Sequence, residues 1–160
     1  MAAILFAGVA VADDKKEAPK FDATKMVGKW AITGGMKDGT KVDADKYKDT
    51  DATYVEATKD KLTLKTPEGT FEFAYKINDK ASPVEVDLEI TAPDMFKGAK
   101  ATGIVKMDGD TMTLCYPAMG GEKPKDFEAK EKSGHYCFTM KKAAKKDKEE
   151  PKPVVKAIDK

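Results

Sequence analysis

Residues 84–90 read VEVDLEI, and residues 71–77 read FEFAYKI. In both stretches apolar side chains alternate with polar or small ones at a period of two. This pattern is typical of a β-strand that has one face in a core and the other in solvent. The intervening residues 78–83, NDKASP, are rich in turn formers. The two stretches therefore predict half-buried strands separated by a turn.

Shorter runs of the same kind occur on both sides of this pair. They cover residues 30–36, 53–57, 61–66, 101–107, 111–116, 127–129 and 135–140, with turn signals at 59–60, 67–69, 97–98, 108–110 and 133–134. Eight or nine short strands, with one helical turn expected at residues 23–27, predict an all-β fold. The two candidate architectures are an antiparallel up-and-down β-barrel of about eight strands and a sandwich. We favour the barrel, because closure removes the exposed edges of so many short strands.

The two ends of the chain differ from this pattern. Residues 2–12 read AAILFAGVAVA. This apolar run is too short to span a bilayer, and it resembles a signal peptide cleaved near Ala12. The alternative is a buried N-terminal strand or helix. We expect a signal peptide at 1–12, a charged linker at 13–20 and an exported chain that is periplasmic or extracellular after cleavage.

The C-terminal residues 143–160 are expected to form a disordered, lysine-rich tail after a barrel domain at 21–142. The last 20 residues hold 8 lysines against 4 acids, and such a segment buries too little apolar surface to offset its ordering entropy. Mixed-sign tails commonly keep a protein soluble. The alternative role is weak contact with an anionic envelope surface.

Composition argues against several functions. The 160 residues suit one domain, and 29 bases against 28 acids give a net charge of +1, so nucleic acid is not an expected partner. All 29 bases are lysines, and the chain has one His and no Arg. Most catalytic and metal-binding residue sets are therefore missing, and the acidic run at 43–51 departs from the EF-hand pattern. We expect no enzyme activity, cofactor, metal site or transmembrane segment, and the sequence carries no signal for an oligomeric state.

Residues 21–30 read FDATKMVGKW. This segment resembles the opening of a lipocalin, in which a short helical turn leads into a Gly-x-Trp motif, here Gly28 and Trp30. Residues 60–64, 109–116 and 123–127 resemble a narrower group, the uncharacterised lipocalin-like domain family found in many copies in planctomycetes, over about 26–142. The resemblance implies a small barrel, but the narrower family has no established activity. Lipocalins pack an Arg of the last strand across the Trp, and this chain offers only Lys141 or Lys142.

The chemistry of this motif favours a structural role at one end of the barrel. Gly28 lets the backbone of the opening turn approach closely, and Trp30 supplies a large apolar plug whose indole N–H needs one acceptor. A lysine can lie over the indole face as a cation. Any ligand is then expected to enter at the other end.

The chain has two cysteines, Cys115 and Cys137, and the residues next to them allow their pairing to be checked. If they lie opposite each other on antiparallel strands, Leu114 meets Phe138 and Thr113 meets Thr139, so like pairs with like. We predict a disulfide, which would stabilise the fold by about 3 kcal/mol. The alternatives are a Cys2His metal site with His135 and two free thiols.

An apolar barrel interior predicts a binding protein. The leading hypothesis is a carrier that holds a small apolar or amphipathic molecule without transforming it, and the alternative is a filled barrel that acts as a protein-interaction or envelope module. The residues expected to contact the ligand are Phe71, Phe73, Tyr75, Leu114, Tyr116, Phe138 and Met140. A carrier requires small inward residues, which the run of Ala99, Ala101 and Gly103 suggests, and an empty interior above about 300 Å³.

Overall fold

The computed structural model describes residues 21–47, 49, 51–67, 69–118 and 120–143. The predicted signal peptide (1–12) and linker (13–20) lie outside the described residues, and so does the predicted tail apart from Ala143.

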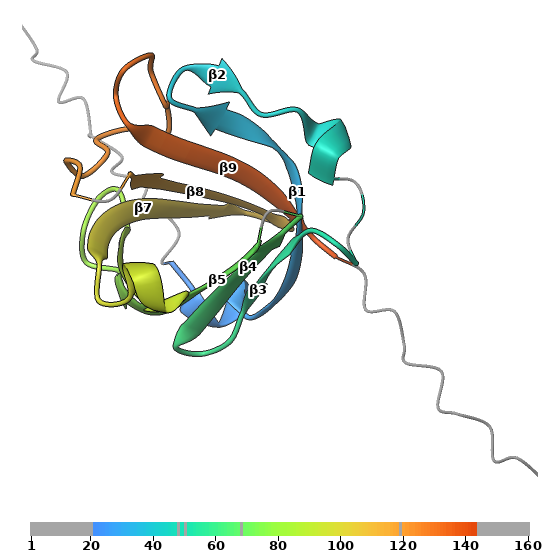
Figure 1. Cartoon of the computed structure of the whole chain (residues 1–160). Helices are drawn as coiled ribbons and strands as arrows, with labels where there is room; N and C mark the ends of the chain where they lie inside the picture. Colours follow the sequence, from blue (N-terminus) through green and yellow to red (C-terminus); the bar gives the residue numbers. More distant parts are fainter. Residues whose placement is uncertain (1–20, 48, 50, 68, 119, 144–160) are drawn as a thin grey trace, which may run out of the picture.

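Within these described residues, nine strands form one antiparallel sheet, and three short 3-10 turns accompany them (Figure 1). The strands are β1 (Gly28–Lys37), β2 (Thr40–Lys41), β3 (Tyr54–Ala57), β4 (Lys61–Thr66), β5 (Gly69–Asn78), β6 (Glu85–Ala92), β7 (Lys100–Asp108), β8 (Thr111–Pro117) and β9 (His135–Lys142). The turns are η1 (Ala23–Met26), η2 (Ala44–Tyr47) and η3 (Asp94–Phe96).

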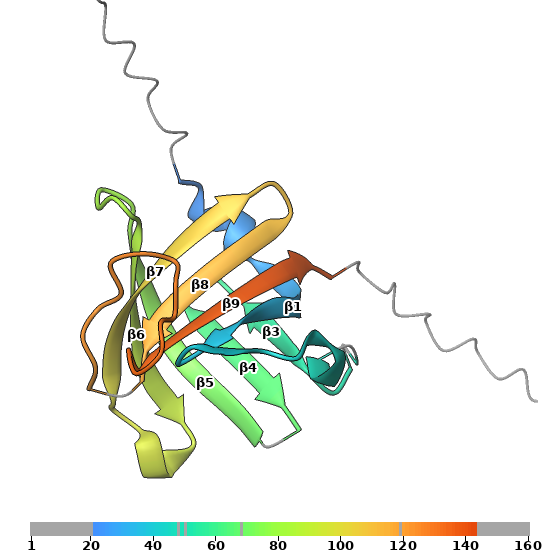
Figure 2. The same cartoon turned by 90° about the horizontal axis from the view of Figure 1, so that it is seen from above.

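The sheet closes into a barrel. From β3 to β9 each strand pairs with the next one in the chain, and β1 pairs with both β3 and β9. The two residues of β2 only extend the end of β1 as a hairpin, so the ring itself has eight strands. Figure 2 shows β7, β8, β9 and β1 side by side along one wall. The prediction of an up-and-down barrel is confirmed over the sandwich, because one continuous sheet forms the ring.

Alternation of side chains places one face of each strand inside the ring. The buried inner residues are Met26, Trp30, Ile32, Val55, Leu62, Phe73, Tyr75, Val86, Leu88, Ile90, Val105, Met112, Leu114 and Met140. The polar positions between them face solvent, as in residues 84–90, where Val86 and Leu88 are buried and Asp87 and Glu89 are exposed. The period-two pattern in the sequence is thus the inside and outside of the barrel.

The disulfide prediction is confirmed together with its register. Cys115 lies opposite Cys137 on β8 and β9, with Leu114 opposite Phe138, and the two sulfurs are bonded. The alternative of a Cys2His site therefore loses its two thiolate ligands. His135 instead lies 3.0 Å, through its Nε2 atom, from the carbonyl oxygen of Glu122.

The strand predicted at residues 127–129 is wrong. These residues belong to the long segment between β8 and β9, where Phe127 and Ala129 pack with Ile104 and the disulfide on the outer face of the barrel. The Gly39 N–H donates to the Ala129 carbonyl at 2.8 Å, which is a single bond rather than a strand ladder. The apolar i, i+2 pair arose because this loop covers a second, smaller apolar cluster.

Candidate functional site

One end of the barrel, the closed end, is filled by the turn η1 and the start of β1. Trp30 is fully buried, and its indole N–H donates to the carbonyl oxygen of Met26 at 2.7 Å. Lys142, at the end of β9, lies with its Nζ atom 5.4 Å from the centre of the indole ring and 3.2 Å from the Lys25 carbonyl oxygen. An ammonium over the indole face and an acceptor for the indole N–H account for both polar needs of this plug.

Gly28 contributes to this packing through the absence of a side chain. Its φ angle is +135°, and a Cβ atom placed there would lie 3.2 Å from Cε of Lys142. A glycine therefore allows the backbone turn and the lysine above the indole to coexist.

The opposite end, the open end, contains a cavity of about 320 Å³. It lies where β1, β4, β6 and β8 end and where β5, β7 and β9 begin. Its wall is formed by Lys37, Val42, Tyr47, Leu64, Thr66, Phe71, Phe73, Leu88, Ile90, Phe96, Ala99, Lys100, Ala101, Tyr116, Pro117, Ala118, Tyr136 and Phe138. This volume equals that of about ten water molecules at their share of the liquid, so the cavity suits a small organic ligand.

Small residues create this space. Ala99 and Ala101 line the cavity at the start of β7, and Ala101 lies opposite Leu88 of β6. Toward the closed end the interior is filled, because the remaining void there has a volume of about 20 Å³. The barrel interior is therefore packed toward the closed end and hollow toward the open end.

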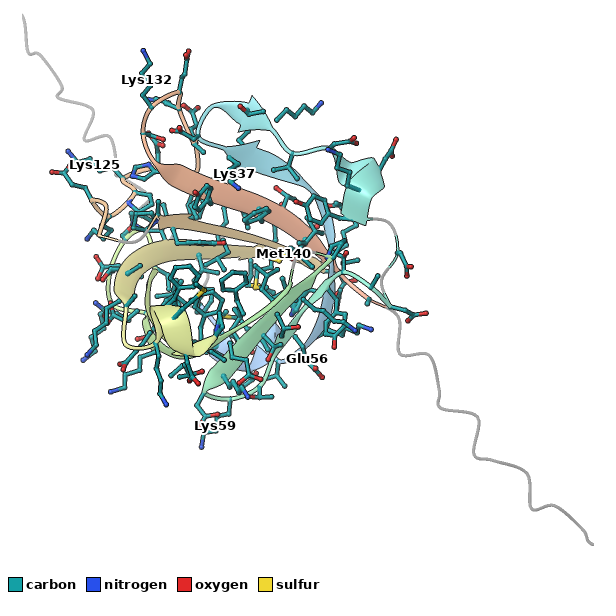
Figure 3. The ribbon with its side chains drawn as sticks, viewed as in Figure 1. Lys37, Glu56, Lys59, Lys125, Lys132 and Met140 are labelled. Atoms are coloured by element: carbon teal, nitrogen blue, oxygen red, sulfur yellow. A yellow bond between two sulfur atoms is a disulfide. The ribbon has the colours of Figure 1, made fainter. Side chains whose placement is uncertain are left out.

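The residues predicted to bind a ligand divide between these two halves. Four of them, Phe71, Phe73, Tyr116 and Phe138, line the open cavity. Leu114 and Met140 line only the small inner void; Met140 is labelled in Figure 3.

Tyr75 lines neither space. It is 6% exposed, and its hydroxyl donates to the Thr58 carbonyl oxygen at 2.6 Å. Burial, with a smaller effect of the Asp60 carboxylate, raises the pKa of Tyr75 above its ordinary value. The structure thus gives this hydroxyl a bond within the barrel wall rather than toward a ligand.

Lys37 is the lining residue that alternation alone misplaces. The pairing of β1 with β9 shifts register between Ile32 and Gly34. After this bulge Lys37 lies opposite Tyr136, whose side chain lines the cavity, so Lys37 faces the opening (Figure 3). Met36 faces outward and is 38% exposed. Strict alternation from Trp30 would have placed Met36 inside. A bulge re-aims the side chains that follow it.

The Tyr116 side chain lies in the cavity wall and is partly buried. Burial raises the pKa of Tyr116 far above its ordinary value, and Tyr136 and Tyr47 raise it further. Its ring contacts those of Tyr136 and Phe138 at centroid distances of 5.7 and 6.2 Å, and no other described residue hydrogen-bonds to its hydroxyl. It is therefore a neutral hydrogen-bond donor inside an apolar cavity.

A second hollow, of about 450 Å³, is a surface depression beside Phe21, Asp22, Ala23, Ile77 and Asp79. Its described lining residues lie at the closed end, beside the turn η1 and the end of β5. Within the described residues no three His, Cys, Asp or Glu side chains gather as a metal site. No helix among them has the length and apolar character needed to cross a membrane.

The fold and cavity define a class of protein: a closed antiparallel barrel with one plugged end and an apolar pocket at the other. No family model, curated protein or solved structure matches the chain.

Proposed function

We propose that this chain is an exported, lipocalin-like binding protein that holds a small apolar or amphipathic molecule in the open half of its barrel. The observation that carries the proposal is the 320 Å³ cavity, which exceeds the volume expected of a filled barrel and lies opposite the Trp30 plug. The Gly28 and Trp30 arrangement with Lys142 over the indole supports the lipocalin-like assignment. The disulfide supports export, because such bonds persist in oxidising compartments.

The proposed role is binding without chemical change. The cavity wall consists of hydrocarbon side chains, hydroxyls and two lysines, with no carboxylate, imidazole or thiol among its described residues. These missing groups are the ordinary general bases and nucleophiles of enzymes. The tyrosines and lysines are better suited to orienting a ligand than to transforming it.

A cavity-filling variant tests this function. Ala101→Phe places a ring in the space beside Leu88, and Ala74→Phe, at an exposed position of β5, is the matched control. We expect the wild type and Ala74→Phe to bind the neutral dye N-phenyl-1-naphthylamine with increased fluorescence, and Ala101→Phe to lose at least about tenfold in affinity. Thermal unfolding of both variants checks that the barrel remains folded.

Two results would contradict the proposal. The first is no dye binding by the folded wild type, and the second is equal binding by the wild type and a folded Ala101→Phe. Either result favours the alternative function, a barrel that acts through its outer surface as an interaction or envelope module. Native mass spectrometry of the unreduced protein from its exported fraction adds the size of any retained ligand.

A further inference from the structure

The charged side chains among the described residues of the cavity wall have one sign. Two lysines, Lys37 and Lys100, line the cavity, and no acidic residue accompanies them among the described residues of its wall. Lys100 is partly compensated, because its Nζ atom lies 3.4 Å from Oε2 of Glu89 and both side chains are well exposed. Lys37 has no such carboxylate among the described residues. The opening therefore presents a positive charge to whatever enters.

Lys37 is held at this place by the sheet itself. The bulge in β1 brings it opposite Tyr136, and its Nζ atom lies 5.2 Å from the centre of the Tyr136 ring. An ammonium over an aromatic face is attracted to it by the electrostatic field of the ring. This weak contact keeps the ammonium beside the cavity while leaving its N–H donors available.

Hydroxyl donors lie next to this cation. Tyr136 and Tyr116 contact each other edge to face in the same wall. A tyrosine hydroxyl is protonated at neutral pH, and burial raises the pKa of Tyr116 further, so this hydroxyl can donate a hydrogen bond to an anionic oxygen.

The remaining wall is apolar. Phe71, Phe73 and Phe138 lie in the cavity wall, together with the aliphatic side chains of β4 and β6. The cavity volume of about 320 Å³ lies within the range of small-molecule binding sites. The site is therefore apolar in its body and cationic at its opening.

We infer that the molecule bound by this barrel is a small amphipathic anion whose acidic head group lies at the opening with Lys37 and the tyrosine hydroxyls, and whose apolar body lies against the phenylalanines. This inference rests on the proposed binding function and specifies the chemical class of its ligand. Hydrogen bonds that involve an ionised group are roughly twice as strong as neutral ones. The head group therefore separates this class from neutral apolar molecules of equal size.

Octanoate and 1-octanol are the probes, because they have the same chain length and differ in head-group charge. Both compete with N-phenyl-1-naphthylamine for the wild-type cavity, and we expect octanoate to bind at least about tenfold more tightly than 1-octanol. Lys37→Met should remove about this tenfold preference and leave 1-octanol within about twofold of its wild-type affinity. Lys37→Arg should retain it, and Lys76→Met, at an exposed position of β5 outside the cavity wall, is the matched control.

The possible failures are distinguishable. Equal binding of octanoate and 1-octanol by a wild type that binds the dye overturns the anion inference and leaves the binding function intact. A parallel loss of both probes in Lys37→Met overturns it as well, since a general packing effect would produce that result. Failure of the dye itself to bind overturns the binding function and the inference with it.

Discussion

Trp30 concentrates two interactions in one side chain at the closed end. Its ring is fully buried, and its N–H satisfies the carbonyl oxygen of Met26. Trp30→Phe leaves that carbonyl unpaired and creates a cavity, so we expect the free energy of unfolding to fall by about 2–3 kcal/mol. Urea unfolding followed by far-ultraviolet circular dichroism measures the change.

Val27 supplies a neighbouring control for this experiment. Its side chain is 44% exposed, and Val27→Ala should change the free energy of unfolding by no more than about 0.5 kcal/mol. If Trp30→Phe proves as stable as Val27→Ala, the plug does not contribute as described.

At the residue scale, the sequence predicted which interactions a side chain requires more accurately than which residues supply them. The chemistry of Trp30 required an acceptor, and the structure supplies one from Met26. Tyr75 shows the opposite case, since its place in a period-two strand gave an inward position but not the Thr58 carbonyl that engages its hydroxyl. Such contacts depend on neighbouring strands, which a pattern within one strand does not contain.

At the scale of elements, the long segment between β8 and β9 is attached to the barrel by an ion pair that depends on pH. The Lys123 ammonium donates a hydrogen bond to the Glu85 carboxylate of β6, and the Asn78 amide donates a second at 3.1 Å. These bonds, that of Lys123 being the stronger, lower the pKa of Glu85 below its ordinary value of 4.5. A lowered pKa means that this contribution to stability is present above pH 4.5 and is lost as pH falls through the folded-state value.

The expected consequence is that the melting temperatures of wild type and Glu85→Gln approach each other as the pH falls. At pH 6 the melting temperature of wild type should be higher than that of Glu85→Gln, by a few degrees at most because the pair is exposed. This difference in melting temperature should shrink below about pH 4. Lys123→Met should behave like Glu85→Gln, because it removes the same contact. A constant difference in melting temperature between pH 6 and pH 3 would show that this pair does not titrate as described.

The bulge in β1 explains why some elements were predicted well and their faces less well. The strands at 61–66 and 111–116 were located to within a residue because alternation is a property of one segment. The register shift after Ile32 is a property of two paired strands. The consecutive glycines Gly34 and Gly35 were the available signal, since glycine in a strand often marks a bulge.

For the whole molecule, the disulfide and the strand pairings close the chain on itself. Cys115 and Cys137 are 22 positions apart, and replacing both by alanine should lower the free energy of unfolding by about 3 kcal/mol, because the unfolded chain regains the entropy of an open loop. Urea unfolding of the double variant under oxidising conditions measures this loss. Two reactive thiols in the native wild type, or an unchanged stability of the variant, would contradict the expectation.

The architecture of the whole molecule could be predicted, but the division of its interior could not. Strand number and the cysteine register followed from alternation and pairing of like residues. Whether an eight-stranded barrel is filled depends on how side chains from every strand meet at the centre, and the alanines at 99 and 101 indicated space without giving its size. The cavity volume is a sum over the ring and belongs to no single segment.

The bulge in β1 also changes how the opening would respond to mutation. Because the bulge adds one residue between Ile32 and Lys37, deleting one residue there would restore strict alternation, and Lys37 would still face the opening. A second deletion in this short stretch would have no bulge to absorb it, and it would exchange the Lys37 ammonium for the thioether of Met36. Related chains that differ here by a single gap would therefore present the same chemistry to solvent, and the bulge acts as a reserve of one residue.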